Sequence, residues 1–163
     1  MYQNINPKIE KKLQEIINGN YEFSLLGTIG KENFPSISKI LPMMNNNILY
    51  VLLSDLSEHT QNINNNNKVS FYFSIKEKNK IKLNNPRLTL NGKIKKINLD
   101  KNNKRFLDLL NAYEKIDKGS QMWGMFIDFN FYEFKPERAL FIEGFGKAYQ
   151  KKLHDELKEK RII

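Results

Sequence analysis

The 163-residue sequence contains no cysteine and only two histidines, His59 and His154. The absence of cysteine excludes a disulfide framework, a thiolate metal site and a cysteine nucleophile. Two histidines are too few for a histidine-rich metal cluster. The sequence also lacks a His-Glu-x-x-His helix and the Ser-x-x-Lys and Gly-x-Ser-x-Gly nucleophile patterns. Any chemistry is therefore expected to come from a bound cofactor.

Long hydrophobic runs are missing as well. No apolar segment approaches the roughly 20 residues that a membrane-spanning helix needs. Residues 1–7 lack the charged and then apolar pattern of a signal peptide. We therefore expect a cytoplasmic protein with no membrane partner.

Acidic residues are outnumbered by basic ones. The chain has 27 Lys and Arg against 18 Asp and Glu, which gives a formal net charge of +9 and a pI of about 9.6. This balance favours an anionic partner, such as nucleic acid, a phosphate-bearing cofactor or a carboxylate-bearing ligand. A Lys- and Asn-rich composition of genomic origin is the alternative explanation. The lysines are spread along the chain, which makes nucleic acid the less favoured partner.

Two or three helices are expected. Asn6 and Pro7 are typical of a helix start, and an apolar stripe continues from there to a stop near Gly19. Ser57 is expected to cap a short helix that ends near Asn64. Asp100 is expected to cap a third helix. The apolar stripe of the first helix is Ile9, Leu13, Ile16 and Ile17, and that of the third is Phe106, Leu107, Leu109, Leu110 and Tyr113.

Strands outnumber the helices and do not alternate with them, which predicts a mainly β fold, a barrel with helices on its outside. The expected strands are 23–29, 35–42, 48–53, 69–75, 87–97, 126–134 and 140–149. The nearly continuous apolar run at 48–53 predicts a strand covered on both faces, and Gly92 predicts a bulge or a close approach of another segment. We expect one domain over residues 1–150, followed by a polar tail over 151–163.

The loop at residues 54–62 is the most informative segment for function. Ser54 and Ser57 lie directly after a buried strand and at the start of a helix, where free N–H groups suit a phosphate. An ordinary serine cap is the alternative. Arg87 begins a strand and offers a planar cationic fork for phosphate or carboxylate, with a solvated strand end as its alternative. The segment Gly144-Phe145-Gly146-Lys147 lacks the spacing of a nucleotide-binding loop.

Three segments, in order, carry a resemblance to a known family. They are Leu26-Gly27-Thr28-Ile29 through Pro35-Ser36-Ile37-Ser38 to Pro42, Leu53-Ser54 through Glu58-His59-Thr60-Gln61-Asn62 to Val69-Ser70, and Phe134-Lys135-Pro136-Glu137-Arg138-Ala139-Leu140-Phe141-Ile142-Glu143-Gly144-Phe145-Gly146-Lys147-Ala148-Tyr149. Over about 23–150, the chain resembles the haem-utilisation branch of the pyridoxamine phosphate oxidase-like FMN-binding split barrels. The resemblance implies a six-stranded antiparallel split barrel that works as a homodimer, with paired ligand sites at the dimer interface.

In the FMN-binding relatives a Ser-Arg-Lys loop after the third strand holds the phosphate. Ser57-Glu58-His59 matches that loop. Glu58 stands in place of the arginine and weakens phosphate binding by adding a like charge. The candidate cofactor-binding residues, for haem or FMN, are Ser38, Ser54, Ser57, His59, Asn62 and Arg87.

In the haem-degrading relatives a histidine of the C-terminal tail ligates the iron, and an aspartate before an aromatic strand orients that histidine. Asp128 matches the aspartate and is the candidate catalytic residue. The family's Gly-His-Arg-Lys segment falls nearest Glu159-Lys160-Arg161, which places Lys160 where the ligand should stand. His154 is the remaining tail histidine and the candidate iron ligand.

The sequence therefore favours a haem-binding protein that degrades haem with O2 to release iron. The electrons for this reaction are expected to come from an unidentified donor. An FMN-dependent oxidoreductase of the same fold is the alternative. A third reading is a non-enzymatic basic module that binds nucleic acid, with an affinity that falls steeply with salt.

Overall fold

The computed structural model describes residues 2–153, and strand pairing organises this part of the chain. The strands form one nine-stranded sheet in the order β1-β9-β8-β7-β6-β2-β3, with β5 paired to both β4 and β8. The strand bounds are β1 Gln3–Asn4, β2 Phe23–Ile29, β3 Pro35–Ile40, β4 Met43–Asn45, β5 Ile48–Ser54, β6 Lys68–Ser74, β7 Arg87–Lys96, β8 Phe129–Gly144 and β9 Lys147–Lys152. The expected mainly β fold is confirmed.

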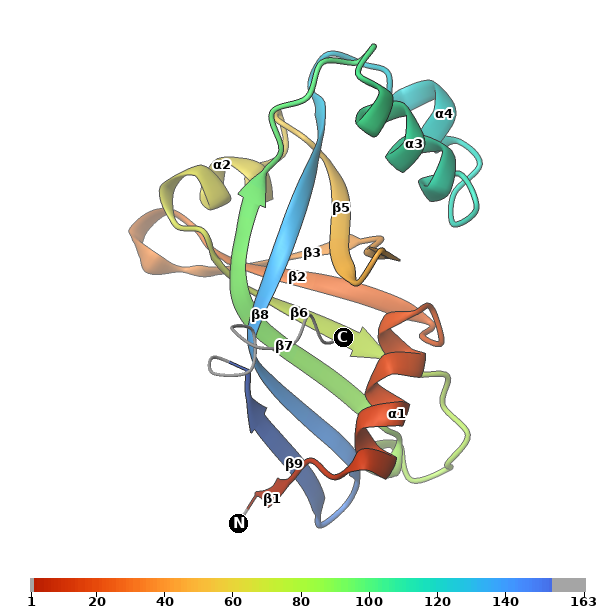
Figure 1. Ribbon diagram of the computed structural model, residues 1–163. Helices are drawn as coiled ribbons and strands as arrows, with labels where there is room; N and C mark the ends of the chain where they lie inside the picture. Colours follow the sequence, from red (N-terminus) through yellow and green to blue (C-terminus); the bar gives the residue numbers. More distant parts are fainter. Residues whose placement is uncertain (1, 154–163) are drawn as a thin grey trace.

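The sheet divides at β8, which is 16 residues long. Its first residues pair with β5 and its last residues pair with β9, while β7 follows it on the other side from Tyr132 to Ile142. In Figure 1, β7 and β8 run through the middle of the molecule and connect its two halves. All pairs are antiparallel except β1 with β9. The start of β8 and the loop after β5 thus lie at one end of the sheet, and the β8–β9 hairpin lies at the other.

Helices cover the outside of the sheet in the positions that Figure 1 shows. Their bounds are α1 Pro7–Ile17, α2 Glu58–Asn65, α3 Lys104–Tyr113 and α4 Ser120–Trp123, with single 3-10 turns at η1 Lys31–Asn33 and η2 Lys82–Asn84. Within the described part of the chain, no helix is long and apolar enough to cross a bilayer. The start of α1 is confirmed, because the Asn6 side chain accepts a hydrogen bond from the Ile9 amide at 3.0 Å.

Two hydrophobic cores lie on opposite faces of β5. Leu49, Val51 and Leu53 pack into the larger core with α1 and the central strands. Tyr50 and Leu52 point the other way, into a smaller core under α3. The prediction that this strand is covered on both faces is therefore confirmed. Burial on both sides explains why its sequence shows no alternation of apolar and polar residues.

The third helix begins later than the sequence indicates. Asn103, not Asp100, is its cap, and the Asn103 side chain accepts a hydrogen bond from the Arg105 amide at 2.9 Å. The Asp100 carbonyl instead closes a turn by accepting from the Asn103 amide at 2.9 Å. This start puts Leu107 on the outer side of the helix, where it is 38% exposed. The prediction that Leu107 lies on the buried face of this helix is therefore wrong.

The last two expected strands are also divided differently. β8 continues through the predicted gap at residues 135–139, and the break comes instead at a hairpin after Gly144. Pro136 fits within β8 because the ladder with β7 shifts register at Gly92, which confirms the expected bulge. Gly146 adopts φ +75° in the hairpin. β9 extends to Lys152, two residues past the expected end of the domain at residue 150.

Candidate functional site

An open pocket of about 400 Å³ lies where β5 ends and α2 begins. Aromatic side chains from α3, α4 and β8 form one wall, and the turn between β5 and α2 forms the polar edge. The lining residues are Lys39, Ile40, Leu41, Leu52, Leu53, Ser54, Ser57, His59, Tyr113, Trp123 and Phe129. Three of the predicted site residues, Ser54, Ser57 and His59, are thus brought together. Volumes of this size suit small-molecule ligands.

Ser54 and Asp128 join the two segments that frame this pocket. Ser54 Oγ donates a hydrogen bond to Asp128 Oδ2 at 2.5 Å and accepts one from the Leu56 amide at 3.1 Å. The Asp55 amide donates to the Asp128 carbonyl at 2.7 Å. These contacts follow from the antiparallel pairing of β5 with β8, in which Ser54 lies opposite Phe129. Asp128 therefore supports the pocket from behind a lining residue.

Asp55 forms a polar cluster beside that bond, and sequence reasoning did not select it. Its carboxylate accepts hydrogen bonds from Lys96 Nζ at 2.9 and 3.1 Å, from Asn130 Nδ2 at 2.9 Å and from Tyr132 Oη at 3.2 Å. Burial and the nearby Asp55 charge raise the pKa of Tyr132. The only signal in the sequence was the position of Asp55 next to Ser54. The cluster fixes the turn from which the pocket's serines project.

His59 is half-buried in the first turn of α2. Burial lowers its pKa below the usual 6.5, and the neighbouring Glu58 charge partly opposes this effect. The imidazole is therefore held in its neutral form at pH 7, in which one ring nitrogen has a free lone pair. Such a nitrogen can accept a hydrogen bond or ligate a metal.

The Ser57 side chain makes no capping hydrogen bond to the helix that it precedes. Its carbonyl accepts from the Thr60 and Gln61 amides at 3.0 and 3.1 Å, which begins α2 without the hydroxyl. Its hydroxyl borders the pocket and can serve a ligand.

Lys101 bonds to the two segments that carry the aromatic wall of the pocket. Its ammonium donates to the carbonyls of Gly124 and Phe129, with a distance of 2.8 Å to Gly124. Burial lowers its pKa, whereas the charges of Asp128 and Asp55 act in the opposite direction. Lys101 thus ties the segment after α4 to the start of β8 and positions Phe129 in the pocket wall.

The other predicted cofactor-binding residues lie elsewhere. Asn62 is buried and donates from Nδ2 to Thr28 Oγ1 at 3.0 Å, which holds α2 onto β2. Ser38 lies on β3 opposite Leu26 and does not line the pocket. Arg87 begins β7, whereas Lys96 at the opposite end of this strand bonds to Asp55 beside the pocket. The Arg87 guanidinium donates to the carbonyls of Leu83 and Asn85 at 3.3 and 3.4 Å. Their roles toward a cofactor stay predictions.

His154 and Lys160 lie outside the described residues. Among residues 2–153 no group of three or more His, Cys, Asp or Glu side chains is arranged to hold a metal ion. His59 is the one described histidine, so the described residues offer a single imidazole to an iron.

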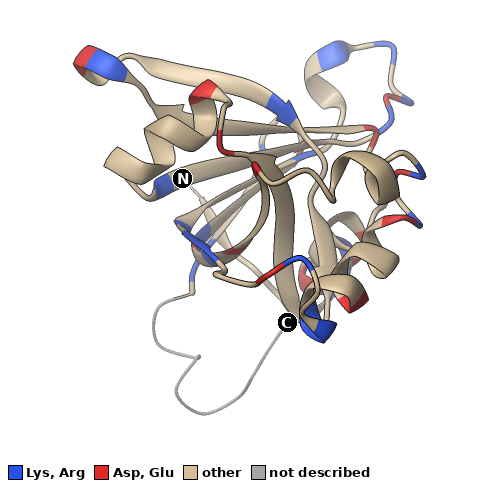
Figure 2. Cartoon of the chain, turned by 90° about the horizontal axis from the view of Figure 1, so that it is seen from above, with Lys and Arg blue, Asp and Glu red and all other residues tan. Residues whose placement is uncertain are grey.

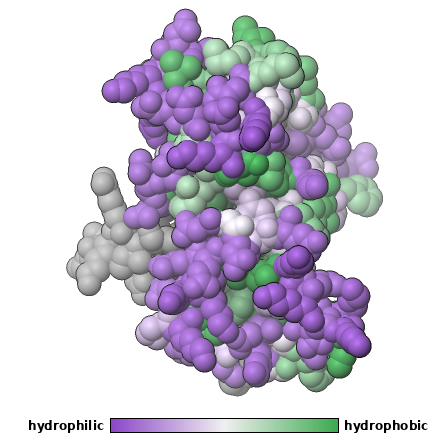
Figure 3. All heavy atoms as spheres, turned by 90° about the vertical axis from the view of Figure 1, so that its right-hand side faces the viewer, coloured by the Kyte–Doolittle hydropathy of each residue, from purple (hydrophilic) through white to green (hydrophobic). Residues whose placement is uncertain are grey.

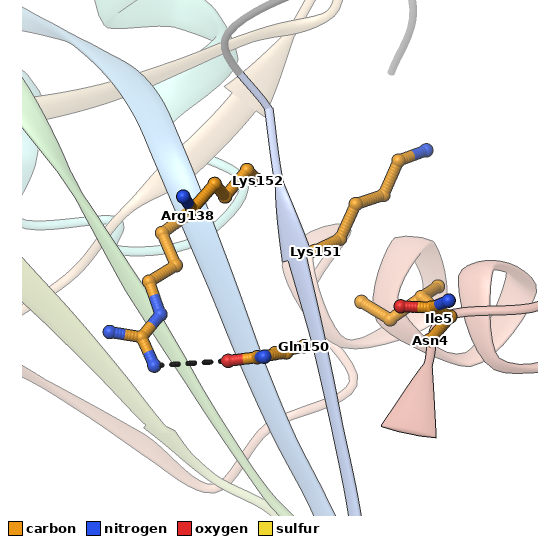
Figure 4. A pocket seen from close by; sticks show the side chains of 6 residues that line it. All are labelled: Asn4, Ile5, Arg138, Gln150, Lys151 and Lys152. Atoms are coloured by element: carbon orange, nitrogen blue, oxygen red, sulfur yellow. Dashed lines mark hydrogen bonds between the residues drawn. The ribbon is translucent and has the colours of Figure 1, made fainter. Parts of the chain in front are cut away.

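A second, basic groove lies between β8, β9 and β1, with a volume of about 660 Å³ (Figure 4). Arg138 and Gln150 lie on the same side of β9 and are joined by a 3.3 Å hydrogen bond, while Lys151 extends from the other side, toward Asn4 and Ile5 (Figure 4). Lys152 pairs with Arg138 across the strands. Sequence reasoning missed this groove, because its cations meet only through the register of the β8–β9 hairpin.

Positive charge is not gathered at one face of the molecule. Lys and Arg lie on loops, strands and helices on several sides (Figure 2). Within the described residues this distribution agrees with the sequence, in which lysines are spread along the chain.

Residues 22–156 match the family model described as CREG, beta-barrel. A search of curated proteins returns no match to this sequence.

Among solved structures, ChuZ from Campylobacter jejuni is 21% identical with a TM-score of 0.76, and the alignment covers 93% of this chain and 62% of ChuZ. A haem-binding protein from Mycobacterium smegmatis is 17% identical with a TM-score of 0.73, and the alignment covers 84% of this chain and 55% of that protein. HutZ, described as a haem storage protein from Vibrio cholerae, is 19% identical with a TM-score of 0.64, with coverages of 78% and 89%. The chain thus spans less than two thirds of the first two proteins, and these likenesses establish the fold.

Proposed function

Because the chain belongs to the CREG β-barrel family, a family of split-barrel proteins, we propose that it binds haem and degrades it with O2. The porphyrin site in this proposal is the pocket between the end of β5, α2 and α4. Two proteins of the same fold are named for binding or storing haem, which supports the choice of ligand. Haem, when bound, supplies the oxygen chemistry, and the protein supplies binding and orientation.

The observation that carries the proposal is the composition of the pocket wall. Trp123 and Phe129 lie 4.9 Å apart between ring centroids, and Tyr113 meets Trp123 edge-on at 6.2 Å. Together with Leu52 and Leu53 these tilted rings make an aromatic and apolar wall against which a porphyrin can pack. Lys39 borders the same pocket and offers a cation to a propionate.

His59 is the described residue best suited to ligate the iron in this pocket. A nitrogen ligand must be unprotonated, and burial lowers the His59 pKa in that direction. His154 is the second candidate and lies outside the described residues. Asp128 acts through Ser54, which it holds at the pocket edge. In this proposal Asp128 positions the polar edge and does not touch the iron.

We further propose that two copies of the chain form a homodimer over this pocket. The pocket is open, and large apolar side chains lie exposed in its bordering segments: Leu56 is 78%, Phe126 53% and Ile127 91% exposed. A second copy would remove these side chains from water and close the ligand site. Sedimentation velocity measures the assembly, and Ile127→Asp is expected to yield monomers.

The test is titration of the purified protein with hemin, followed by absorption. We expect a strong Soret band that weakens or shifts in His59→Ala, while Lys147→Ala, in the β8–β9 hairpin at the opposite end of the molecule from α3 and α4, leaves it unchanged. A change confined to His154→Ala would move the iron ligand to the tail. Loss of the Soret band under O2 and a reductant, with free iron captured by a chelator, would support degradation. Hemin binding no stronger than that of an unrelated basic protein contradicts the proposal.

FMN is the second candidate ligand, favoured by one observation. Ser57 and His59 border the pocket at the N-terminus of α2, where the helix presents N–H groups and partial positive charge. Glu58 in the same turn places a negative charge beside that end. A fluorescence-quenching titration with FMN tests this reading. Quenching that Ser57→Ala abolishes would favour FMN over haem, and no quenching would remove the reading.

A further inference from the structure

The loop between β6 and β7 presents lysines and apolar residues to solvent together. Residues 76–83, Lys-Glu-Lys-Asn-Lys-Ile-Lys-Leu, are all exposed. They include four lysines and one glutamate, Glu77, which pairs with Lys82. Ile81 is 65% and Leu83 is 67% exposed, values at odds with their hydrophobicity. The loop therefore exposes large apolar side chains to water directly beside positive charges.

The tip of the β8–β9 hairpin extends this apolar surface. Phe145 is 85% exposed at that tip. Its amide donates to Asn84 Oδ1 at 3.1 Å, and an added Cβ on Gly144 would lie 3.4 Å from the Asn84 carbonyl. The hairpin therefore sits directly against η2, beside Leu83. Figure 1 shows the hairpin and the β6–β7 loop at the end of the molecule opposite α3 and α4.

The loop backbone is held in place from inside by Asn85. This buried side chain accepts from the Lys78 and Asn79 amides at 3.0 and 2.8 Å, and donates to the Asn79 and Lys82 carbonyls at 3.0 and 3.2 Å. An amide side chain can make four such bonds, so its capacity is fully used on the loop. The outward direction of Ile81 and Leu83 is thus built into the fold and costs little ordering on binding.

Behind the loop lies a pocket of about 270 Å³ that includes Lys82 and Arg87 among its lining residues. The nearby carboxylates are Glu77, bonded to Lys82, Glu143, bonded to Lys12, and Glu22, whose charge also acts on Lys82. Lys147 and Lys76 add exposed cations at either side. Positive charge therefore exceeds negative charge around the three apolar side chains. Figure 3 shows hydrophobic atoms at the lower edge of the molecule, bordered by hydrophilic ones.

We propose that Ile81, Leu83 and Phe145, with the lysines of the 76–82 loop, form a docking surface for an anionic lipid bilayer. Apolar side chains enter the boundary between headgroups and acyl chains, while lysines beside them attract the anionic headgroups. Long lysine side chains can keep their charge at headgroup level as the apolar tips enter. A contact of this kind is peripheral and needs no membrane-spanning helix. It leaves the haem pocket, at the other end of the sheet, open to ligand.

The chain offers a matched control region in the turn after α3. Lys115 and Lys118 are exposed there, and Ile116 is 42% exposed. The double lysine substitution in this turn changes net charge by the same amount as the double lysine substitution in the docking surface. Ile116→Ser likewise removes a partly exposed apolar side chain, at a different place on the molecule.

Co-sedimentation with vesicles tests the proposal. We expect binding to phosphatidylglycerol–phosphatidylcholine vesicles that falls with added salt, and little binding to pure phosphatidylcholine. Phe145→Ser and Ile81→Ser/Leu83→Ser are each expected to weaken binding about tenfold through lost apolar burial. Lys78→Glu/Lys80→Glu is expected to weaken it by about tenfold or more. Ile116→Ser and Lys115→Glu/Lys118→Glu should stay within about twofold of the wild type. Thermal melts check that each variant is folded.

A second readout reports the depth of the contact. Trp123, the only tryptophan, lies in the pocket wall far from the docking surface. Brominated lipids should quench added fluorescence in Phe145→Trp and leave Trp123 of the wild type unquenched. Equal binding to neutral and anionic vesicles, or equal losses in control and loop variants, would overturn the proposal. So would self-association without vesicles that the loop variants abolish, because the surface would then join two copies of the chain.

Discussion

Ser54 Oγ donates a 2.5 Å hydrogen bond to Asp128 Oδ2, across 74 positions of sequence. Ser54 ends β5 and Asp128 precedes β8, so the bond fastens the two strands at the edge of the aromatic pocket. The same serine oxygen accepts from the Leu56 amide, which fixes the turn toward α2. One hydroxyl therefore links the core strands to the candidate site.

Ser54→Ala is expected to lower the free energy of unfolding by about 1–3 kcal/mol, because a carboxylate then loses a hydrogen bond that it makes in the folded state. Urea denaturation measures this change. Ser57→Ala is the matched control, since the Ser57 side chain makes no capping bond, and its effect should stay within about 0.5 kcal/mol. Equal losses in the two variants would mean that the Ser54–Asp128 bond contributes nothing to stability.

Gly92→Ala is expected to destabilise the protein by at least about 2 kcal/mol, because the new methyl group meets packed backbone. A Cβ at this position would lie 2.1 Å from the Lys135 carbonyl and 2.8 Å from Pro136 Cα, at the bulge that accommodates the proline. At Gly27, on β2, the nearest atom to an added Cβ is 3.6 Å away. Gly27→Ala should therefore change the urea midpoint little, and a similar loss at both sites would argue against the close approach.

Asn62→Ala is expected to lower the unfolding free energy by about 1–3 kcal/mol and to leave hemin affinity within about twofold of the wild type. The reason is that Asn62 Nδ2 is buried against Thr28 Oγ1 at 3.0 Å, where it holds α2 in place. Gln61→Ala, on the exposed side of the same helix, serves as the control. A large loss of hemin binding in a folded Asn62→Ala protein would restore Asn62 as a ligand-contacting residue.

His59 is expected to make stability depend on pH. Its pKa is lowered in the folded protein, so below about pH 6.5 the unfolded chain binds more protons at this residue than the folded chain does. This contribution is present above the unfolded pKa and is lost as the pH falls toward the folded one. Urea midpoints at pH 5.5 and 7.5 should therefore differ more in the wild type than in His59→Gln. Identical pH dependence in the two proteins would contradict the lowered pKa.

The local sequence determined those elements whose signals lie within a few residues. The Asn6 side chain and the apolar stripe of α1 are sufficient to start and orient that helix. The apolar run of β5 predicted a strand buried on both faces, because its apolar residues do not alternate with polar ones. Asp100 and Asn103 are both good caps, and the local sequence could not choose between them.

In the site, Ser54, Ser57 and His59 could be predicted because they lie in one continuous loop. Asp128 was found through a family resemblance, and its bond to Ser54 required the pairing of β5 with β8. The Asp55 cluster collects Lys96, Asn130 and Tyr132 from two further strands, which no local pattern relates.

The sequence by itself thus determined a mainly β chain with a polar loop poised at a helix start, because hydrophobic spacing and helix caps act over short distances. Tertiary structure decided which side chains meet. Strand register brought Arg138 beside Lys152. The order of the strands also placed Arg87 at the end of β7 away from the predicted phosphate loop and set the Phe145 amide against Asn84. Register depends on pairing between distant segments, and a shift of one residue between β8 and β9 would turn Arg138 and Lys152 to opposite faces.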